Sequence, residues 1–352
     1  MSTAGPYTSV PSPAVDAALD GALARIAGEL DRRRPAGLAG AVLGGGYGRG
    51  EGGVRHTPEG DRLYNDLDFF VFTDHADRKQ RGRIADELRA IAGPLEKELG
   101  IAVDFSPPKE LRSLANVSRT LMFQELRNGW KPVWGTVDLS RWIPALGPAE
   151  IPYTEAVRLL MNRGMGLLFA GERLAAGDGD ADFIVRNMNK AALGCGDALL
   201  LAAGQYRWRG ADRVAAFAEY AEKNGLPAEY AEAYAEAFRY KLEPDPVLPE
   251  DPRRCWADRR RFFLDAVRLA AGADAGAEIA DAARGLRRKA ADARSVRHFL
   301  RWLVRARGLR PFGRLTEDPV VTVLDMICGV LAAGEICPAC PPKLHGLWCK
   351  FN

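Results

Sequence analysis

The chain has 352 residues, of which 47% are hydrophobic and 27% charged, with a formal net charge of +3. These values are ordinary for a globular protein that buries a sizeable core. The near-neutral charge implies no strong polyanion-binding field, although it neither requires nor excludes an RNA partner. No apolar run approaches the length of a membrane span, so we expect no membrane partner and a cytoplasmic protein. The six cysteines are scattered, which indicates reduced thiols, and the richness in Ala, Arg and Gly is typical of a GC-rich bacterial genome.

The first part of the chain predicts a mixture of helices and strands. Residues 1–13 are rich in Ser, Thr and Pro and predict a disordered leader. Apolar residues at helical spacing predict helices at 14–34 and 77–99, the second ending at Gly100. Apolar or alternating segments predict strands at 38–43, 66–72, 101–105 and 131–137.

The character of the sequence changes after about Pro148. From there on, apolar residues recur at helical spacing and strand patterns are lacking. The predicted helices are 153–170, 183–206, 211–223, 227–240, 258–271 and 319–334. The fold class is therefore α+β, with a mixed domain at 14–148 and an all-helical domain at 149–352.

Three acidic residues carry the strongest chemical signal. Asp66 and Asp68 are two apart in a predicted strand, so their side chains point to the same side. Asp104, in the next predicted strand, adds a third carboxylate, with Asp138 as its rival. Converging carboxylates suit hard cations such as Mg²⁺, and two such ions can stabilise both oxygens of an in-line displacement. Without a cation the cluster would repel itself.

A glycine-dense turn precedes these carboxylates, at residues 44–50. Glycines allow close approach of the backbone to a phosphate, and successive N–H groups form an anion nest. Arg49 in the same turn could pair with a phosphate oxygen, and Glu51 could orient Arg49 or cap a helix. A phosphate-binding turn together with metal-binding carboxylates is what nucleotidyl transfer requires.

The two motifs together resemble a known signature. The segment LGGGYGRGE at 43–51, followed by NDLDF at 65–69, is similar to the signature of the DNA polymerase beta superfamily of nucleotidyltransferases. That signature is an apolar strand, a Gly-Gly or Gly-Ser pair, a short helix, then Asp-x-Asp on the next strand. The glycine motif particularly resembles the nucleotidyltransferase domain of the PII-protein uridylyltransferases.

The resemblance implies roles for individual residues. Asp66, Asp68 and Asp104 would hold the metals, and Gly45 and Gly46 would contact the triphosphate. The fold implied is a mixed sheet with flanking helices. The resemblance covers about residues 35–110, so it transfers the reaction and not the acceptor. The stretch 52–64 is longer than the family pattern, and an inserted hairpin or loop is expected there.

Two features of the helical domain are further candidates. Lys190 lies on the polar face of the predicted helix 183–206 and would close over the triphosphate; the alternative is a solvated face with ordinary ion pairs. Asn162 and Arg163, in an otherwise apolar helix, are either structural anchors or phosphate contacts. The tail has the spacing Cys-x2-Cys-x4-His-x3-Cys, which resembles a zinc knuckle one residue short and predicts Zn²⁺ binding less strongly than a packed tail. Its four ligands would be Cys337, Cys340, His345 and Cys349.

The leading hypothesis is a metal-dependent nucleotidyltransferase that binds ATP or another nucleoside triphosphate. It would move a nucleoside monophosphate from a nucleoside triphosphate to a hydroxyl acceptor on a small molecule or protein, less favourably on RNA, with release of pyrophosphate. Two Mg²⁺ ions, or Mn²⁺ in their place, would bind at Asp66, Asp68 and Asp104, and Asp104 would also serve as general base. The alternatives are a nucleotide-binding regulator without catalysis and an RNA-binding adaptor that uses the Cys/His tail.

Overall fold

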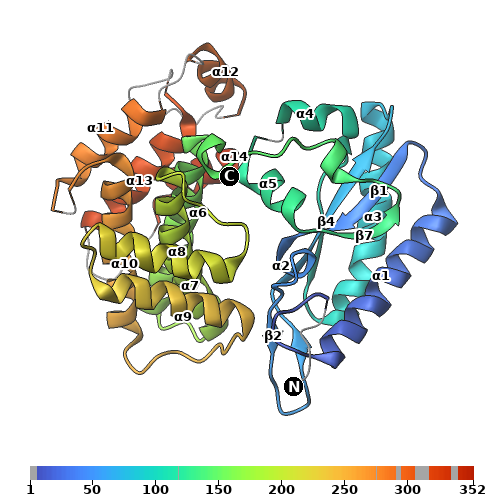
Figure 1. The fold of residues 1–352 in the computed structure, drawn as a ribbon, viewed down its shortest axis with the longest axis horizontal. Helices are drawn as coiled ribbons and strands as arrows, with labels where there is room; N and C mark the ends of the chain where they lie inside the picture. Colours follow the sequence, from blue (N-terminus) through green and yellow to red (C-terminus); the bar gives the residue numbers. More distant parts are fainter. Residues whose placement is uncertain (1–5, 118, 275, 291–294, 306–316, 334–339) are drawn as a thin grey trace. The chain divides into compact units, whose positions relative to one another are not determined.

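The computed structural model describes residues 6–117, 119–274, 276–290, 295–305, 317–333 and 340–352. The architecture is mixed α/β, with a small mixed sheet and many helices (Figure 1). The chain divides into two compact units. One comprises residues 1–147 together with 239–245, and the other comprises 148–238 and 246–352.

The first unit begins with a segment that packs against helix α1 (Pro13–Arg33). Tyr7 is buried and its hydroxyl donates to Asp20 (2.6 Å), while the Ser12 side chain caps the helix. The expectation of a disordered leader is therefore wrong for residues 6–13, because ring burial and a helix cap offset the entropy of ordering the segment. Residues 1–5 of that predicted leader lie outside the described part of the chain.

The sheet of this unit has the strand order β5-β4-β1-β7, with β6 also paired to β4. Strand β4 pairs antiparallel with β1 and parallel with β5 and β6. The strands are β1 (Leu38–Leu43), β4 (Asp66–Thr73), β5 (Ala102–Phe105), β6 (Lys109–Glu110) and β7 (Lys131–Gly135). The four expected strands are confirmed, with ends shifted by up to two residues.

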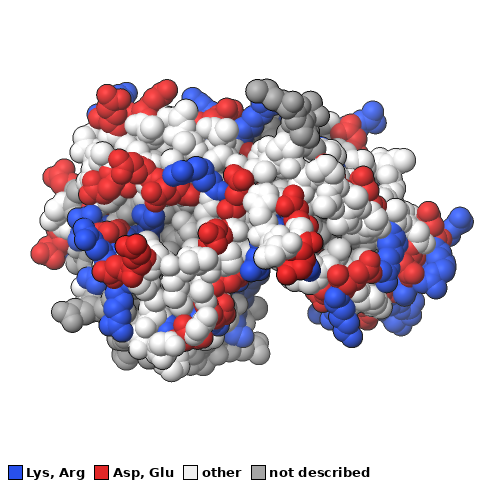
Figure 2. All heavy atoms as spheres, turned by 90° about the horizontal axis from the view of Figure 1, so that it is seen from below, with Lys and Arg blue, Asp and Glu red and all other residues white. Residues whose placement is uncertain are grey.

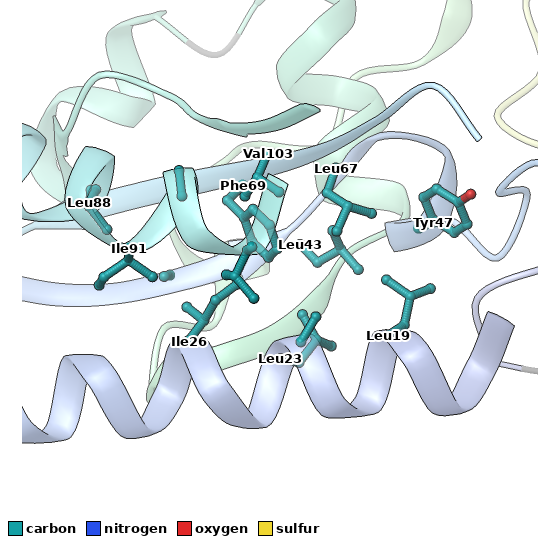
Figure 3. Close-up of a cluster of buried hydrophobic side chains, with 14 of the residues drawn as sticks. Leu19, Leu23, Ile26, Leu43, Tyr47, Leu67, Phe69, Leu88, Ile91 and Val103 are labelled. Atoms are coloured by element: carbon teal, nitrogen blue, oxygen red, sulfur yellow. The ribbon is translucent and has the colours of Figure 1, made fainter. Parts of the chain in front are cut away.

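One face of the sheet is covered by α1 and by α3 (Arg78–Leu99). Helix α3 starts with a capping box at Asp77. It ends at Leu99, and Gly100 takes the left-handed C-cap conformation at the position that the sequence predicts. In Figure 3 the apolar side chains of both helices point toward those of the strands. The labelled members are Leu19, Leu23, Ile26, Leu43, Tyr47, Leu67, Phe69, Leu88, Ile91 and Val103.

The other face packs on short elements that the sequence analysis leaves unassigned. They are α4 (Leu114–Val117), α5 (Leu121–Asn128) and the 3₁₀ helices η1 (Leu111–Ser113) and η2 (Leu139–Arg141). Their apolar side chains form a second core with Val42 and Phe72 of the sheet. Because β4 is buried on both faces in its later part, its aromatic residues occur without strict alternation.

The stretch 52–64 forms a hairpin of β2 (Val54–Arg55) and β3 (Arg62–Leu63). Of the two expected alternatives, a hairpin or a loop, the hairpin is the one present. His56 of this hairpin lies between two carboxylates: its Nδ1 is 2.7 Å from Asp61 and its Nε2 is 3.4 Å from Glu243. Asp61 also accepts a hydrogen bond from Ser12 (2.8 Å). The hairpin is thus tied both to the start of α1 and to the segment 239–245.

Replacing His56 by Gln is expected to cost stability in a pH-dependent way. The hydrogen bond to Asp61, and then Glu243, raise the pKa of His56, while His56 and Ser12 lower the pKa of Asp61. The stabilisation from His56 is complete below its ordinary value of 6.5 and disappears as pH rises through the raised pKa. The stabilisation from Asp61 is complete above the ordinary pKa of an Asp side chain, 3.8, and disappears as pH falls through the lowered pKa of Asp61.

The melting temperature of wild type and His56→Gln should therefore differ most between about pH 4 and 6.5 and converge toward pH 9. Asp61→Asn should show the same convergence at high pH, because it removes the main partner of His56. A difference that stays constant from pH 5.5 to pH 9 would contradict this assignment.

The regular secondary structure described for the second unit consists of helices, joined by turns and loops. Helix α7 buries the apolar arc that its spacing predicts, which includes Ile184, Met188 and Cys195. None of the described helices combines the length and the apolarity needed to cross a membrane. The elements are η3 (Pro148–Glu150), α6 (Tyr153–Ala176), α7 (Ala181–Ala202), α8 (Gly210–Lys223), α9 (Ala228–Leu242), α10 (Pro252–Ala271), α11 (Ile279–Ala290), α12 (Ser295–Arg305), α13 (Pro319–Ala333) and α14 (Pro342–Phe351). The end of α9, from Arg239 on, belongs to the first unit.

Acidic and basic side chains are mixed across the molecular face shown in Figure 2. This mixture agrees with the formal net charge of +3 for the whole chain. Charged groups of both signs in close proximity partly neutralise each other's field beyond a Debye length.

Candidate active site

The three predicted carboxylates lie on one face of the sheet. On β4, Leu67 and Phe69 point into the core beneath α1 and α3, so Asp66 and Asp68 point to the opposite face. Asp68 pairs directly with Asp104 of β5 in the parallel register. Paired residues of neighbouring strands project to the same side, and the strand context thus brings Asp104 beside the Asp-x-Asp pair.

The charges in this cluster oppose one another. Partial desolvation, the negative charge of Asp66 and then that of Glu96 raise the pKa of the Asp104 carboxyl. Glu96, near the end of α3, accepts a hydrogen bond from the Val103 N–H (3.1 Å) and so fixes the start of β5. Like charges held together by the backbone favour a cation, and carboxylate oxygens are the donors that Mg²⁺ prefers. The residues therefore fit a divalent cation in donor type and charge.

As the side chains stand, the described residues contain no group of three or more His, Cys, Asp or Glu side chains that could hold a metal ion. Coordination of one ion by Asp66, Asp68 and Asp104 together therefore stays a prediction.

Replacing Asp104 by Asn is expected to stabilise the protein in the absence of divalent cations. A raised pKa in the folded state means that stability is lost as pH rises from the ordinary value of 3.8 through the folded pKa, and Asn removes that loss. Because the Asp104 side chain is exposed, the gain in melting temperature at pH 7 should be small, about 1–2 °C.

The test compares thermal melts of wild type and Asp104→Asn in EDTA at pH 7 and at pH 4. The gain in melting temperature should be smaller at pH 4 than at pH 7. Asp138→Asn is the matched control of opposite sign, because hydrogen bonds from Ser140 lower the pKa of Asp138. A lower melting temperature for Asp104→Asn in EDTA at pH 7 would show that the charge repulsion is not significant.

The glycine turn contacts Asp68 directly. The turn forms the short helix α2 (Gly45–Gly48), and the Gly44 N–H donates to the Asp68 carbonyl oxygen (2.8 Å). Gly45 has a φ of +60°, and a Cβ added to it would lie 2.2 Å from Asp68 Oδ2. The turn and the carboxylate therefore share one small space, which only glycine leaves open. Of the two predicted phosphate-binding residues, Gly45 lies beside this predicted metal ligand, and Gly46 follows it in the turn and packs against Glu51 and Gly52.

Tyr47, in the middle of the glycine motif, has a structural role that the sequence analysis does not recognise. It is buried, its hydroxyl donates to the Gly53 carbonyl oxygen (2.7 Å), and it accepts from the Tyr64 N–H (2.8 Å). Burial raises the pKa of Tyr47 to about 12. A Cβ on Gly52 would collide with its ring. Tyr47 therefore joins both ends of the inserted hairpin to the glycine turn.

Arg49 lies between two carboxylates. Its Nη1 is 3.3 Å from Glu125 of α5, and its Nε is 3.8 Å from Glu51. This geometry agrees with one of the two roles considered for Glu51, that of orienting Arg49. Arg49 is mostly buried, with 15% of its side chain exposed, so a phosphate would have to compete with these carboxylates. Phosphate binding by Arg49 stays a prediction.

The rival third carboxylate, Asp138, lies elsewhere. It caps η2, accepts from the Ser140 N–H (3.0 Å) and pairs with Arg141 (3.4 Å). It follows β7, which is separated from β4 by β1. The strand order therefore favours Asp104 over Asp138 as the neighbour of the Asp-x-Asp pair.

The candidates in the helical unit show mainly structural contacts. Asn162 accepts a hydrogen bond from the Trp348 indole N–H (3.1 Å), which agrees with the structural-anchor alternative. Arg163 packs against Gly194 of the neighbouring helix α7. On the polar side of α7, Arg186 pairs with Asp182 (3.6 Å), as an ordinary solvated face would. Lys190 lies on α7, and a nucleotide contact for it stays a prediction.

The described part of the Cys/His tail is a packed helix. His345 lies on α14, and its ring contacts Phe169 edge-on and Trp348 in a stacked arrangement. Cys340 precedes α14, Cys349 is exposed on it, and Cys337 lies outside the described residues. The three described members do not form a metal-binding group in this structure. Zinc binding at the tail stays a prediction.

No family model matches this chain, and comparisons with curated proteins and with solved structures also find no match.

Proposed function

We propose that the protein is a magnesium-dependent nucleotidyltransferase whose first unit has a polymerase-beta-like fold followed by a helical domain. The observation that carries the proposal is the contact between the glycine turn and Asp68. Asp68 touches Gly45 and pairs in register with Asp104, while Asp66 lies two residues away on the same face. A phosphate-binding turn and a cation site that share one carboxylate would bring a triphosphate and its metal ions together.

The residues have separable tasks in this reaction. The backbone N–H groups of the turn, at Gly45 and Gly46, would bind the β- and γ-phosphates and orient the α-phosphorus for in-line attack. Asp66, Asp68 and Asp104 would hold Mg²⁺, which supplies charge stabilisation to the attacking and leaving oxygens. The raised pKa of Asp104 suits a group that accepts the proton of the acceptor hydroxyl. Pyrophosphate would leave from the side of the glycine turn.

The proposal for the acceptor extends to its chemical class. A hydroxyl on a small molecule or on a protein is favoured over an RNA end, since the net charge is only +3. The donor is a nucleoside triphosphate, with ATP as the first choice for a test.

The test is incubation of purified protein with each of the four α-³²P-labelled nucleoside triphosphates, an extract of bacterial cells as the acceptor source, and either Mg²⁺ or EDTA. The proposal predicts label in an acceptor fraction and release of unlabelled pyrophosphate, both dependent on Mg²⁺. The labelled fraction then identifies the acceptor as protein, RNA or small molecule. Tight binding of a triphosphate without transfer from any of the four would indicate a regulator instead.

A further inference from the structure

The segment Arg239–Asp245 clusters with the first unit, although most of its sequence neighbours belong to the second. It contributes the last turn of α9 and the residues directly after it. Within the first unit it contacts the region of the glycine turn and the hairpin that follows it.

Lys241 makes the charged contact of the segment that lies nearest the glycine turn. Its Nζ lies 3.0 Å from Glu51 Oε2, and Glu51 in turn lies 3.8 Å from Arg49, which pairs with Glu125. These four residues form a row of alternating charge beside the glycine turn. Only 12% of the Glu51 side chain is exposed, so water screens its negative charge little, and Lys241 and Arg49 are two cations close enough to stabilise that charge.

Tyr240 adds a second contact. Its hydroxyl is 2.8 Å from that of Tyr64, and the two rings meet edge-on. The Tyr64 N–H donates to Tyr47 in the glycine motif. The backbone also approaches closely, because a Cβ on Gly53 would lie 2.9 Å from the Lys241 carbonyl oxygen. The segment thus reaches the turn through two routes, one ionic and one aromatic.

We propose that Arg239–Asp245 is a strap that holds the glycine turn, and that Lys241 is a positioning residue for triphosphate binding that acts through Glu51. The inference deepens the proposed function and rests on it. The row Lys241–Glu51–Arg49–Glu125 contains two acids and two bases and is neutral. Without the Lys241 charge the row carries one net negative charge beside the site where a triphosphate binds, and that charge repels the polyanion.

The central test is steady-state kinetics of Lys241→Met, which keeps the length of the side chain and removes its charge. The KM for the triphosphate should rise about tenfold, as expected from one uncompensated charge near a polyanion, while kcat stays within about twofold. Lys241→Arg should restore KM. Adding Glu51→Gln to Lys241→Met should also lower KM again, because the charges that remain in the row, those of Arg49 and Glu125, cancel. Lys79→Met, at an exposed lysine in the first turn of α3, is the matched control.

A measurement independent of catalysis accompanies the kinetics. The Gly48 and Glu51 N–H groups donate within the turn to the Gly44 and Gly46 carbonyl oxygens, each at 2.8 Å. Hydrogen exchange of these two amides should be faster in Lys241→Met than in wild type and unchanged in Lys79→Met.

The outcomes are separable. If wild type binds and transfers no nucleotide, the proposed function fails, and the exchange rates alone decide whether Lys241 holds the turn. If wild type is active, a KM for Lys241→Met within twofold of wild type overturns the positioning role. Unchanged exchange at Gly48 and Glu51 overturns the strap in either case. A double variant with a higher KM than Lys241→Met would refute the charge-balance explanation.

Discussion

Asp68→Asn is expected to lower the rate of nucleotidyl transfer about a thousandfold or more, because a charged metal ligand is worth several kcal/mol of transition-state stabilisation and about 1.4 kcal/mol corresponds to a factor of ten. Asp68 is the residue on which the two halves of the site converge. It pairs with Asp104 across the strands, and its carboxylate lies against Gly45. Asn keeps the shape and one oxygen but removes the charge that a cation requires.

The loss should appear in kcat, and the fold should remain intact. Asp68 lies on the polar face of β4, so Asn fills the same space without exposing the core beneath Leu67 and Phe69. Circular dichroism should therefore match wild type, and the melting temperature in EDTA should not fall below that of wild type, because Asn also removes one of the mutually repelling charges. Asp138→Asn is the control, since this Asp caps η2 away from the cluster and should retain full transfer. Activity of Asp68→Asn within tenfold of wild type would remove Asp68 from the metal site.

The fold of the first unit could be predicted where local patterns decide it. The alternating residues of β4, the periodicity of α3 and the left-handed Gly100 after it are local signals, and each appears in the structure as expected. The side of the sheet on which Asp66 and Asp68 lie follows from the same alternation. Asp104 could be selected because its strand follows α3 directly, and a strand that follows a crossover helix returns parallel to the first.

The remaining features depend on contacts between distant parts of the chain. Lys241 meets Glu51 across 190 positions, and no spacing or periodicity records such a pair. Glu125 lies on α5, a short helix whose eight residues give too few turns for a clear pattern. Tyr7 packs because of its ring, although its neighbours have the composition of a disordered leader. Composition describes an average, whereas one buried aromatic residue decides whether a short segment is ordered.

Gly45→Ala is expected to reduce transfer about a hundredfold, because a shift of about 1 Å in a reacting group can cost that much. The added methyl group would lie 2.2 Å from Asp68 Oδ2, so the carboxylate has to move. The φ of +60° adds about 1–2 kcal/mol of backbone strain for any residue with a Cβ. Stability and activity should therefore both fall, and the melting temperature and the rate of transfer are the two measurements.

Gly28→Ala is the matched control for the effect of glycine itself. Gly28 is exposed within α1 and has no atom within 4 Å of an added Cβ, so alanine should stabilise the helix by about 0.5–1 kcal/mol and leave transfer unchanged. The opposite signs at the two glycines would separate steric conflict from loss of chain flexibility. Wild-type activity of Gly45→Ala would show that the turn does not constrain Asp68.

Combining Gly45→Ala with Asp68→Asn tests whether the two changes damage the same feature. If the methyl group acts by displacing the Asp68 carboxylate, the double variant should transfer no more slowly than Asp68→Asn alone, because the displaced group no longer contributes. Independent losses would instead multiply, to about five orders of magnitude for a thousandfold and a hundredfold effect. Multiplication would mean that Gly45 acts on the triphosphate through its backbone and not through Asp68. The size of the combined loss therefore distinguishes a turn that binds phosphate from one that only makes room for a metal ligand.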